Sequence, residues 1–197
     1  AKSESKITMF DANTGEDLWK KAPKTKGYVQ HFYTMDDGIL FGIQSGGINK
    51  ISYDGKTLFK KPLKTGENII TMANTPQGLI YITGSDANIV NLKTGEQVWK
   101  KPLKFKSAGS VVSTFDKTNN RYLIATNKIV YAIDAASGDI SELSKVKFEE
   151  KESPTNIEIR DSNIFLNSSQ NLSSIDSNGS ENYHVYFKSP GKSGFMK

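Results

Sequence analysis

The residue types best suited to metal or acid–base chemistry are rare in this chain. Its 197 residues include two histidines, His31 and His184, and no cysteine. The absence of cysteine excludes disulfides, thiolate metal sites and cysteine nucleophiles. The histidines are far apart in the sequence, and His31 lies in the strand-like string 28–33. A structural role for His31 is therefore a simpler explanation than a role as a metal ligand. We therefore predict no catalytic residue and no metal site.

Short motifs for nucleophilic, metal or phosphate chemistry are also absent from the sequence. It contains no GxSxG, HExxH or P-loop pattern. A glycine-bearing string at 42–47 is explained by a strand followed by a hairpin turn, because a phosphate cradle needs a helix behind it and the sequence shows none there. The sequence therefore argues against an enzyme and against a cofactor.

Lysine is the charged residue whose placement is regular. Doublets recur at three places, each followed by a proline within two residues: Lys20, Lys21, Lys60, Lys61, Lys100 and Lys101. The net charge is +5. We favour the hypothesis that the lysines protect an exposed strand edge from pairing with other chains. The alternative is a basic surface for an acidic partner. Nucleic acid is not expected, since no strand alternates basic and aromatic residues.

A repeated turn explains where these lysines fall. Five turns end in glycine, and four of them are followed four residues later by an aromatic residue. The glycines are Gly15, Gly55, Gly95, Gly138 and Gly179, and the aromatics are Trp19, Phe59, Trp99 and Tyr183, with a shifted Leu143 in the fourth copy. The turns lie roughly 40 residues apart, and this period is typical of β-propeller blades.

Each repeat reads as short strands separated by turns, with no helical periodicity. The second strands are expected at 39–43, 79–83, 122–125 and 164–166, and they are apolar on both faces, as strands between two blades should be. The fourth strands are expected at 17–20 and 96–100 in the two clearest copies. All apolar runs are of strand length, so no membrane span is predicted. The predicted fold is all-β, a propeller of four-stranded antiparallel blades.

Four and a half blades are predicted within a single propeller segment, 1–197. The partial blade spans residues 5–24, and the complete blades span residues 27–64, 67–104, 108–148 and 153–188. Propellers have about four to eight blades and close by sharing one of them. We therefore expect this segment to be part of a larger propeller, with the remaining blades supplied by the same or another chain.

The turns themselves favour a structural role for their polar residues. In a hairpin loop built on a type I turn, the last position has a positive φ, which glycine adopts without a steric cost. An aspartate or asparagine at the front, such as Asp11, Asn91 or Asp134, can accept hydrogen bonds from the N–H groups of the turn. A calcium site is not predicted, because it requires several converging oxygens.

The strings at 8–21 and 88–101 resemble the repeat of the quinoprotein-like, or PQQ-repeat, β-propellers. Both contain the Thr-Gly and Trp positions of that repeat, and the other three copies are degenerate. The resemblance covers almost the whole chain and implies a propeller in which the aromatic residue packs between adjacent blades. It implies no single activity, because the family includes quinone dehydrogenases and non-catalytic envelope proteins, among them a lipoprotein of the outer-membrane assembly machinery.

The dehydrogenases of this family carry a cysteine pair, a calcium site and a catalytic aspartate beside the quinone. This chain has no cysteine, and no acid stands out in a context distinct from a repeat turn. We therefore predict a non-enzymatic scaffold that binds other proteins of the bacterial cell envelope, in the periplasm, at the outer membrane or secreted. The alternatives are a fragment of a PQQ-dependent dehydrogenase and a propeller that binds a small ligand or glycan, which would show a polar pocket with exposed aromatics in several equivalent loops.

Overall fold

The computed structural model describes residues 6–105 and 109–188, and nearly all of its regular structure is β. The strands are β1 (Val29–Met35), β2 (Gly38–Ile43), β3 (Ile48–Ile51), β4 (Ile69–Thr75), β5 (Gly78–Thr83), β6 (Asp86–Val90), β7 (Leu103–Lys104), β8 (Val112–Asp116), β9 (Arg121–Ala125), β10 (Ile129–Asp134), β11 (Ile140–Lys145), β12 (Asn156–Arg160), β13 (Asn163–Asn167), β14 (Asn171–Ile175) and β15 (Glu181–Tyr186). One short 3-10 helix, η1, spans Glu149–Lys151. None of the helices in these ranges is long and apolar enough to cross a membrane.

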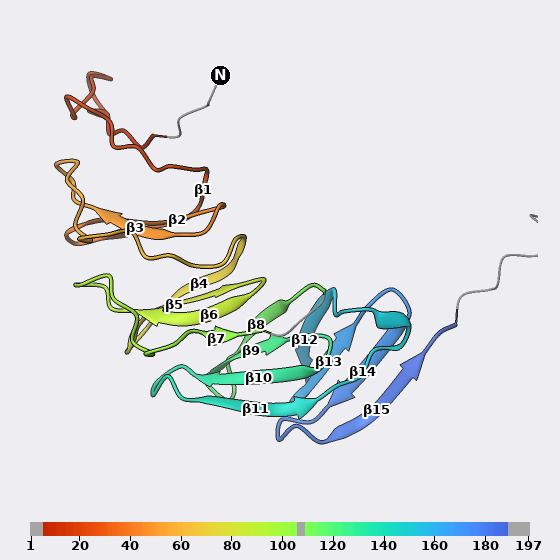
Figure 1. The fold of residues 1–197 in the computed structure, drawn as a ribbon. Coiled ribbons are helices and arrows are strands. Elements are labelled where there is room, and N and C mark those ends of the chain that lie inside the picture. Colours follow the sequence, from red (N-terminus) through yellow and green to blue (C-terminus); the bar gives the residue numbers. More distant parts are fainter. Residues whose placement is uncertain (1–5, 106–108, 189–197) are drawn as a thin grey trace, which may run out of the picture. The chain divides into compact units, whose positions relative to one another are not determined.

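The strands form four antiparallel sheets, one in each predicted complete blade (Figure 1). Sheet β1–β2–β3 has three strands, and the sheets β4–β7, β8–β11 and β12–β15 have four each. The sheets lie within residues 27–64, 67–104, 108–148 and 153–188, although residues 5 and 108 of the predicted boundaries lie outside the described ranges. The chain divides into two compact units, 1–105 and 106–197, and the single-domain organisation stays a prediction.

The first unit is built around apolar clusters between neighbouring repeats. Sheet β1–β3 contributes Leu40 and Ile48 to the larger cluster, and sheet β4–β7 contributes Leu79 and Tyr81, all of them fully buried. A smaller cluster, with Phe41 at its centre, joins the other face of β1–β3 to the first half-repeat. The alternation of β2 explains both contacts, because successive side chains point to opposite faces of a strand.

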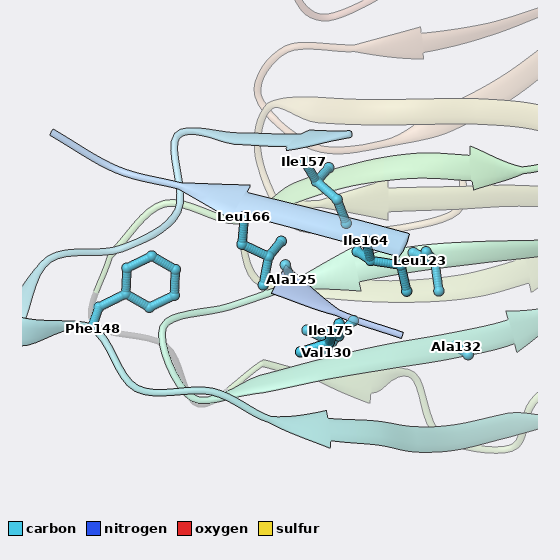
Figure 2. Packing of buried hydrophobic residues seen from close by; sticks show 9 residues of the cluster. All are labelled: Leu123, Ala125, Val130, Ala132, Phe148, Ile157, Ile164, Leu166 and Ile175. Carbon is cyan, nitrogen blue, oxygen red and sulfur yellow. The ribbon is translucent and has the colours of Figure 1, made fainter. Parts of the chain in front are cut away.

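The second unit has one core, formed between its two sheets (Figure 2). Leu123 on β9 and Val130 on β10 face Ile164 and Leu166 on β13. Phe148, in the connection between the sheets, closes one end of this cluster. The predicted second strands at 122–125 and 164–166 are therefore confirmed as the central buried strands β9 and β13.

The fourth strands of the first unit differ from the sequence-based expectation. At 17–20 and 96–100, the structure has only single bridges, Phe10 with Asp17 and Val90 with Gln97. The backbone then leaves the ladder, and the pairing resumes at β7 in the third repeat. In the second unit, by contrast, β11 and β15 are continuous outer strands. The expectation was wrong at Trp19 and Phe59, because these rings pack on the glycine turn of the next repeat and not within the ladder of their own sheet.

Candidate functional site

The repeated aromatic side chains contact the glycine turn of the following repeat. Phe59 is only 1% exposed, and a Cβ atom added to Gly95 would lie 2.5 Å from its ring. Trp19 is buried in the same way: its ring lies against Gly55, and its Nε1 donates a hydrogen bond to the carbonyl oxygen of Tyr53 at 2.7 Å. The motif therefore joins one repeat to the next, and the side chains that define it are occupied in packing.

The remaining copies of the motif use the aromatic position differently. Leu143 is partly buried and lies against Gly179 mainly through its backbone carbonyl, with its side chain slightly farther away. Tyr183, in the last repeat, is 42% exposed. Trp99 is half-buried, and both its backbone N–H and its carbonyl are held by the side chain of Asn88.

The glycine turns have the geometry expected of type I turns closed by glycine. The φ angles are 72° at Gly15, 82° at Gly55, 74° at Gly95, 78° at Gly138 and 92° at Gly179. At the front of the first turn, the Asp11 carboxylate accepts hydrogen bonds from two backbone N–H groups, which hold its pKa below the ordinary value. Asp134 has the same two contacts and the same direction of pKa shift. These acids stabilise turns.

The lysine doublets lie on the segments where the outer strand is interrupted. In the second repeat, Leu58 N donates to Lys50 O, and Leu63 and Ile48 then exchange two hydrogen bonds, so residues 59–62 bulge away from β3 between these pairs. The first and third repeats have equivalent bulges at residues 19–22 and 99–102. All six doublet lysines are exposed. Within the described part of the chain, none of their ammonium groups has an ion-pair partner.

The bulge of the second repeat forms one wall of a groove, which we call the outer groove. Residues 60–64 line one side, and residues 94–97 of the next repeat's turn line the other, around a volume of about 410 Å³. Three of the lining side chains are basic, Lys60, Lys61 and Lys64, and one is acidic, Glu96. The structure therefore places lysines in a concave surface between two repeats rather than along a regular strand edge.

The sequence-based predictions missed two ion pairs, each within one repeat and each with a further hydrogen bond to the next repeat. Lys50 is 4% exposed, and its Nζ lies 2.6 Å from a carboxylate oxygen of Asp37 and 3.4 Å from the carbonyl oxygen of Leu92 in the next repeat. In the second unit, Arg121 donates to Asp116 at 2.9 Å and to the carbonyl oxygen of Ser177 at 2.7 Å. The sequence does place a basic residue in an apolar strand, at Lys50 and at Arg121. It does not show the partners of these residues, which lie in turns or on another strand.

In both ion pairs the basic side chain also contacts the next repeat, from β3 at Lys50 and from β9 at Arg121. Leu92 and Ser177 both occupy the second position of a repeat turn, and Asp37 and Asp116 both belong to the first hairpin of their sheet. Burial alone would raise the pKa of Asp116, but hydrogen bonds from Asn119 and Arg121 outweigh it and keep the pKa low. Each contact thus joins a basic side chain to an acid of its own sheet and to a carbonyl oxygen in the turn of the next repeat.

One constellation in the second unit resembles catalytic machinery. Ser173 Oγ lies 2.7 Å from His184 Nδ1, and His184 Nε2 lies 3.0 Å from a carboxylate oxygen of Glu149. Lys147 and then His184 lower the pKa of Glu149, against the opposing effect of burial. Ser173, however, is only 2% exposed, so its hydroxyl is not accessible to a substrate. This relay ties η1 to β14 and β15.

The other histidine also makes a structural contact. His31 Nε2 donates to the carbonyl oxygen of Ile69 at 2.9 Å, and the neighbouring Tyr33 hydroxyl donates to the carbonyl oxygen of Met72. Both contacts connect β1 to β4 in the next sheet. Among the described residues, no three histidine, aspartate or glutamate side chains are grouped so that they could share a metal ion.

Comparison with known families identifies the repeat. A family model described as "Outer membrane protein assembly factor BamB", of the PQQ-repeat type, matches residues 3–181. The chain belongs to this family. The match includes both units and all five glycine turns. No curated protein matches the chain.

Solved structures place the BamB-like chain in the β-propeller fold. The computationally designed protein Ika8 matches with a TM-score of 0.57 over 94% of this chain, and BamB from Moraxella catarrhalis with 0.53 over 86%, both at 12% identity. The WD40 domain of Pan2 from Neurospora crassa matches with 0.51 over 81%, again at 12% identity. This chain covers 57%, 56% and 50% of those structures. It is therefore a partial propeller in relation to them.

Proposed function

We propose that this BamB-like chain is a non-catalytic propeller scaffold of the bacterial cell envelope, and that it binds other envelope proteins. One observation carries the proposal: the best-buried side chains of the repeat motif pack between repeats, and its acids hold their own turns. Phe59 and Trp19 pack on the next glycine turn, and Asp11 holds its own turn together. The relay of Ser173, His184 and Glu149 does not support an enzyme, because its hydroxyl is buried.

The envelope location rests on the family, whose description names an outer-membrane assembly factor. We further propose that the remaining blades come from the same or another chain. The solved structures that match are longer than this chain, which covers 57% of the first and 56% of the second. The last sheet also has a hollow of about 440 Å³. The exposed aromatic Tyr183 lines this hollow together with Phe165 and Leu172.

The glycan-binding alternative receives less support from this hollow. It contains the features of a sugar site, an exposed aromatic with amide and charged neighbours such as Asn156, Asn167 and Arg160. However, it lies on the face of the last sheet rather than in equivalent loops of several repeats. A sheet face of this kind is better explained as a surface that packs against another blade.

Equilibrium dialysis tests the non-catalytic part of the proposal. Purified protein supplied with calcium and pyrroloquinoline quinone should not retain the quinone, and it should not reduce a dye in the presence of alcohols or aldose sugars. Stoichiometric quinone binding would overturn the scaffold and favour the dehydrogenase alternative. Cross-linking in intact cells, followed by mass spectrometry, should attach the chain to envelope proteins; cross-links only to cytoplasmic proteins would contradict the location.

A further inference from the structure

We propose that the outer groove, between residues 60–64 and 94–97, binds an extended acidic segment of a partner protein. The inference rests on the proposed scaffold function and specifies the chemistry of one partner surface. The groove combines three unpaired lysines with a concave shape and with backbone groups that have no partner. Each of these three observations favours an acidic polypeptide.

The position of the lysines is the first observation. If lysine doublets served to protect strand edges, they should lie on the continuous outer strands, where unpaired backbone groups are most regular. The outer strands of full length are β11 and β15, each with one register shift, and neither contains a doublet. The doublets lie instead on the bulges at 19–22, 59–62 and 99–102, where no regular edge exists. Edge protection therefore does not explain their placement.

The unpaired groups of the bulge are the second observation. The ammonium groups of Lys60, Lys61 and Lys64 have no ion pair within the described part of the chain, whereas Lys50, Lys56 and Lys104 each pair with an aspartate. The backbone N–H and C=O groups of Lys60 and Lys61 have no hydrogen-bond partner among the described residues. An extended peptide can pair with such backbone groups while its carboxylates meet the lysines.

The walls of the groove are the third observation. Pro62, Leu63 and Gly95 supply apolar or backbone surface, and Gln97 is already engaged with the hydroxyl of Tyr81. Glu96 is the single acid in the lining, so the groove keeps an excess of positive charge. A side chain of a bound segment can enter this hollow, while a flat layer of lipid head groups cannot follow its walls. The concave shape therefore favours a polypeptide over a membrane surface.

Fluorescence anisotropy with a defined probe tests the proposal. The probe is a fluorescein-labelled peptide of alternating glutamate and serine, and its control is the same peptide with glutamine in place of glutamate. The groove variant is K60Q/K61Q/K64Q. The matched variant is K117Q/K128Q/K145Q, which removes the same charge from three exposed lysines of the second unit. Circular dichroism melting of both variants should match the wild type, since all the substitutions are at the surface.

The groove variant should bind the acidic probe about tenfold more weakly than the wild type, and the matched variant within about twofold. Wild-type binding should weaken between low and physiological salt, because exposed charges are screened over about 8 to 10 Å. An equal loss in both variants would mean that net charge alone attracts the probe, and the proposal would fail. No binding of the probe to the wild type at low salt would also overturn it.

Two further measurements test the proposal. The first needs only the wild-type protein, and the second uses lipid vesicles in place of the peptide. Bound probe should protect Lys60, Lys61 and Lys64 from amine acetylation, read by mass spectrometry, while Lys117, Lys128 and Lys145 stay reactive. Vesicles of anionic phosphatidylglycerol should not co-sediment the protein through these lysines. If they do, and the groove variant abolishes it, the surface binds membranes and the inference is wrong. Neither failure would affect the scaffold, which the quinone and cross-linking measurements test separately.

Discussion

The two units of this chain finish the same repeat in two ways. In residues 6–105, the outer strand breaks, an aromatic ring leaves the sheet for the next glycine turn, and a lysine doublet follows on the bulge. In residues 109–188, the outer strands β11 and β15 are continuous, and Leu143 makes the contact with the next turn. The next glycine turn thus meets a ring in the first unit and Leu143 in the second, and the outer edge also differs between the two units.

This difference shows that the motif connects neighbouring repeats and that the structure of the outer edge varies around this connection. Around Phe59 the backbone leaves the ladder, the lysines of the bulge are exposed, and the backbone groups of Lys60 and Lys61 have no partner among the described residues. Leu143 reaches Gly179 from the point where the pairing of β10 with β11 shifts register, and β11 still spans six residues around it. The outer groove therefore lies next to Phe59, an aromatic residue that packs on the glycine turn of the next repeat.

The largest expected effect comes from removing a buried aromatic. Phe59→Ala should lower the free energy of unfolding by about 3 to 5 kcal/mol, because it deletes a ring that is 1% exposed and leaves a cavity between repeats. Tyr183→Ala, at the same motif position but 42% exposed, should cost less than about 1 kcal/mol. Urea unfolding of the two variants measures the comparison. Equal losses would show that the two units do not differ at this position.

A glycine pair sharpens the same comparison by separating backbone strain from packing. Gly15 and Gly95 have nearly equal φ angles, 72° and 74°, but a Cβ meets nothing within 4 Å at Gly15 and the Phe59 ring at 2.5 Å at Gly95. Gly15→Ala should therefore cost only the left-handed strain of about 1 kcal/mol, and Gly95→Ala about 1 to 3 kcal/mol more. Thermal melting of both variants gives the difference, and similar values would exclude the ring contact.

The ion pair of the second unit should show a pH signature. Asp116→Asn should cost about 2 kcal/mol at neutral pH, because the nearly buried carboxylate accepts charged hydrogen bonds. Its folded pKa lies below the ordinary 3.8, so its contribution is complete above that value and is lost as the pH falls through the folded pKa. Urea unfolding from pH 7 down to about pH 3 should show the wild type and variant converging. A constant difference would contradict the assignment.

The smallest expected effect concerns self-association. Replacing all six doublet lysines by glutamine should leave the chain monomeric in sedimentation velocity, because the bulges present no regular edge. Replacing Glu142 and Lys145 on β11 by valine should promote association, since β11 is a continuous outer strand. The reverse pattern would restore edge protection as the role of the doublets and would weaken the case for the outer groove.

Much of the fold could be predicted because its signals are local. A glycine that ends a turn, an aspartate or asparagine that begins it, and an apolar second strand each act within a few residues. Their recurrence about every 40 residues then indicates a propeller, because a single repeat cannot bury both faces of its sheet. The buried strands β5 and β9 and the positive φ angle of Gly95 follow from such local patterns.

The contacts that join different repeats were decided only by the tertiary structure. The sequence does not show that Leu143 takes the place of a ring, that Lys50 and Arg121 reach equivalent carbonyls from different strands, or that His184 meets Glu149. It also does not show that the outer strand breaks at the lysine doublets. These features depend on the distance between two sheets and on the room left for a side chain there, and neither is encoded in the period of one repeat.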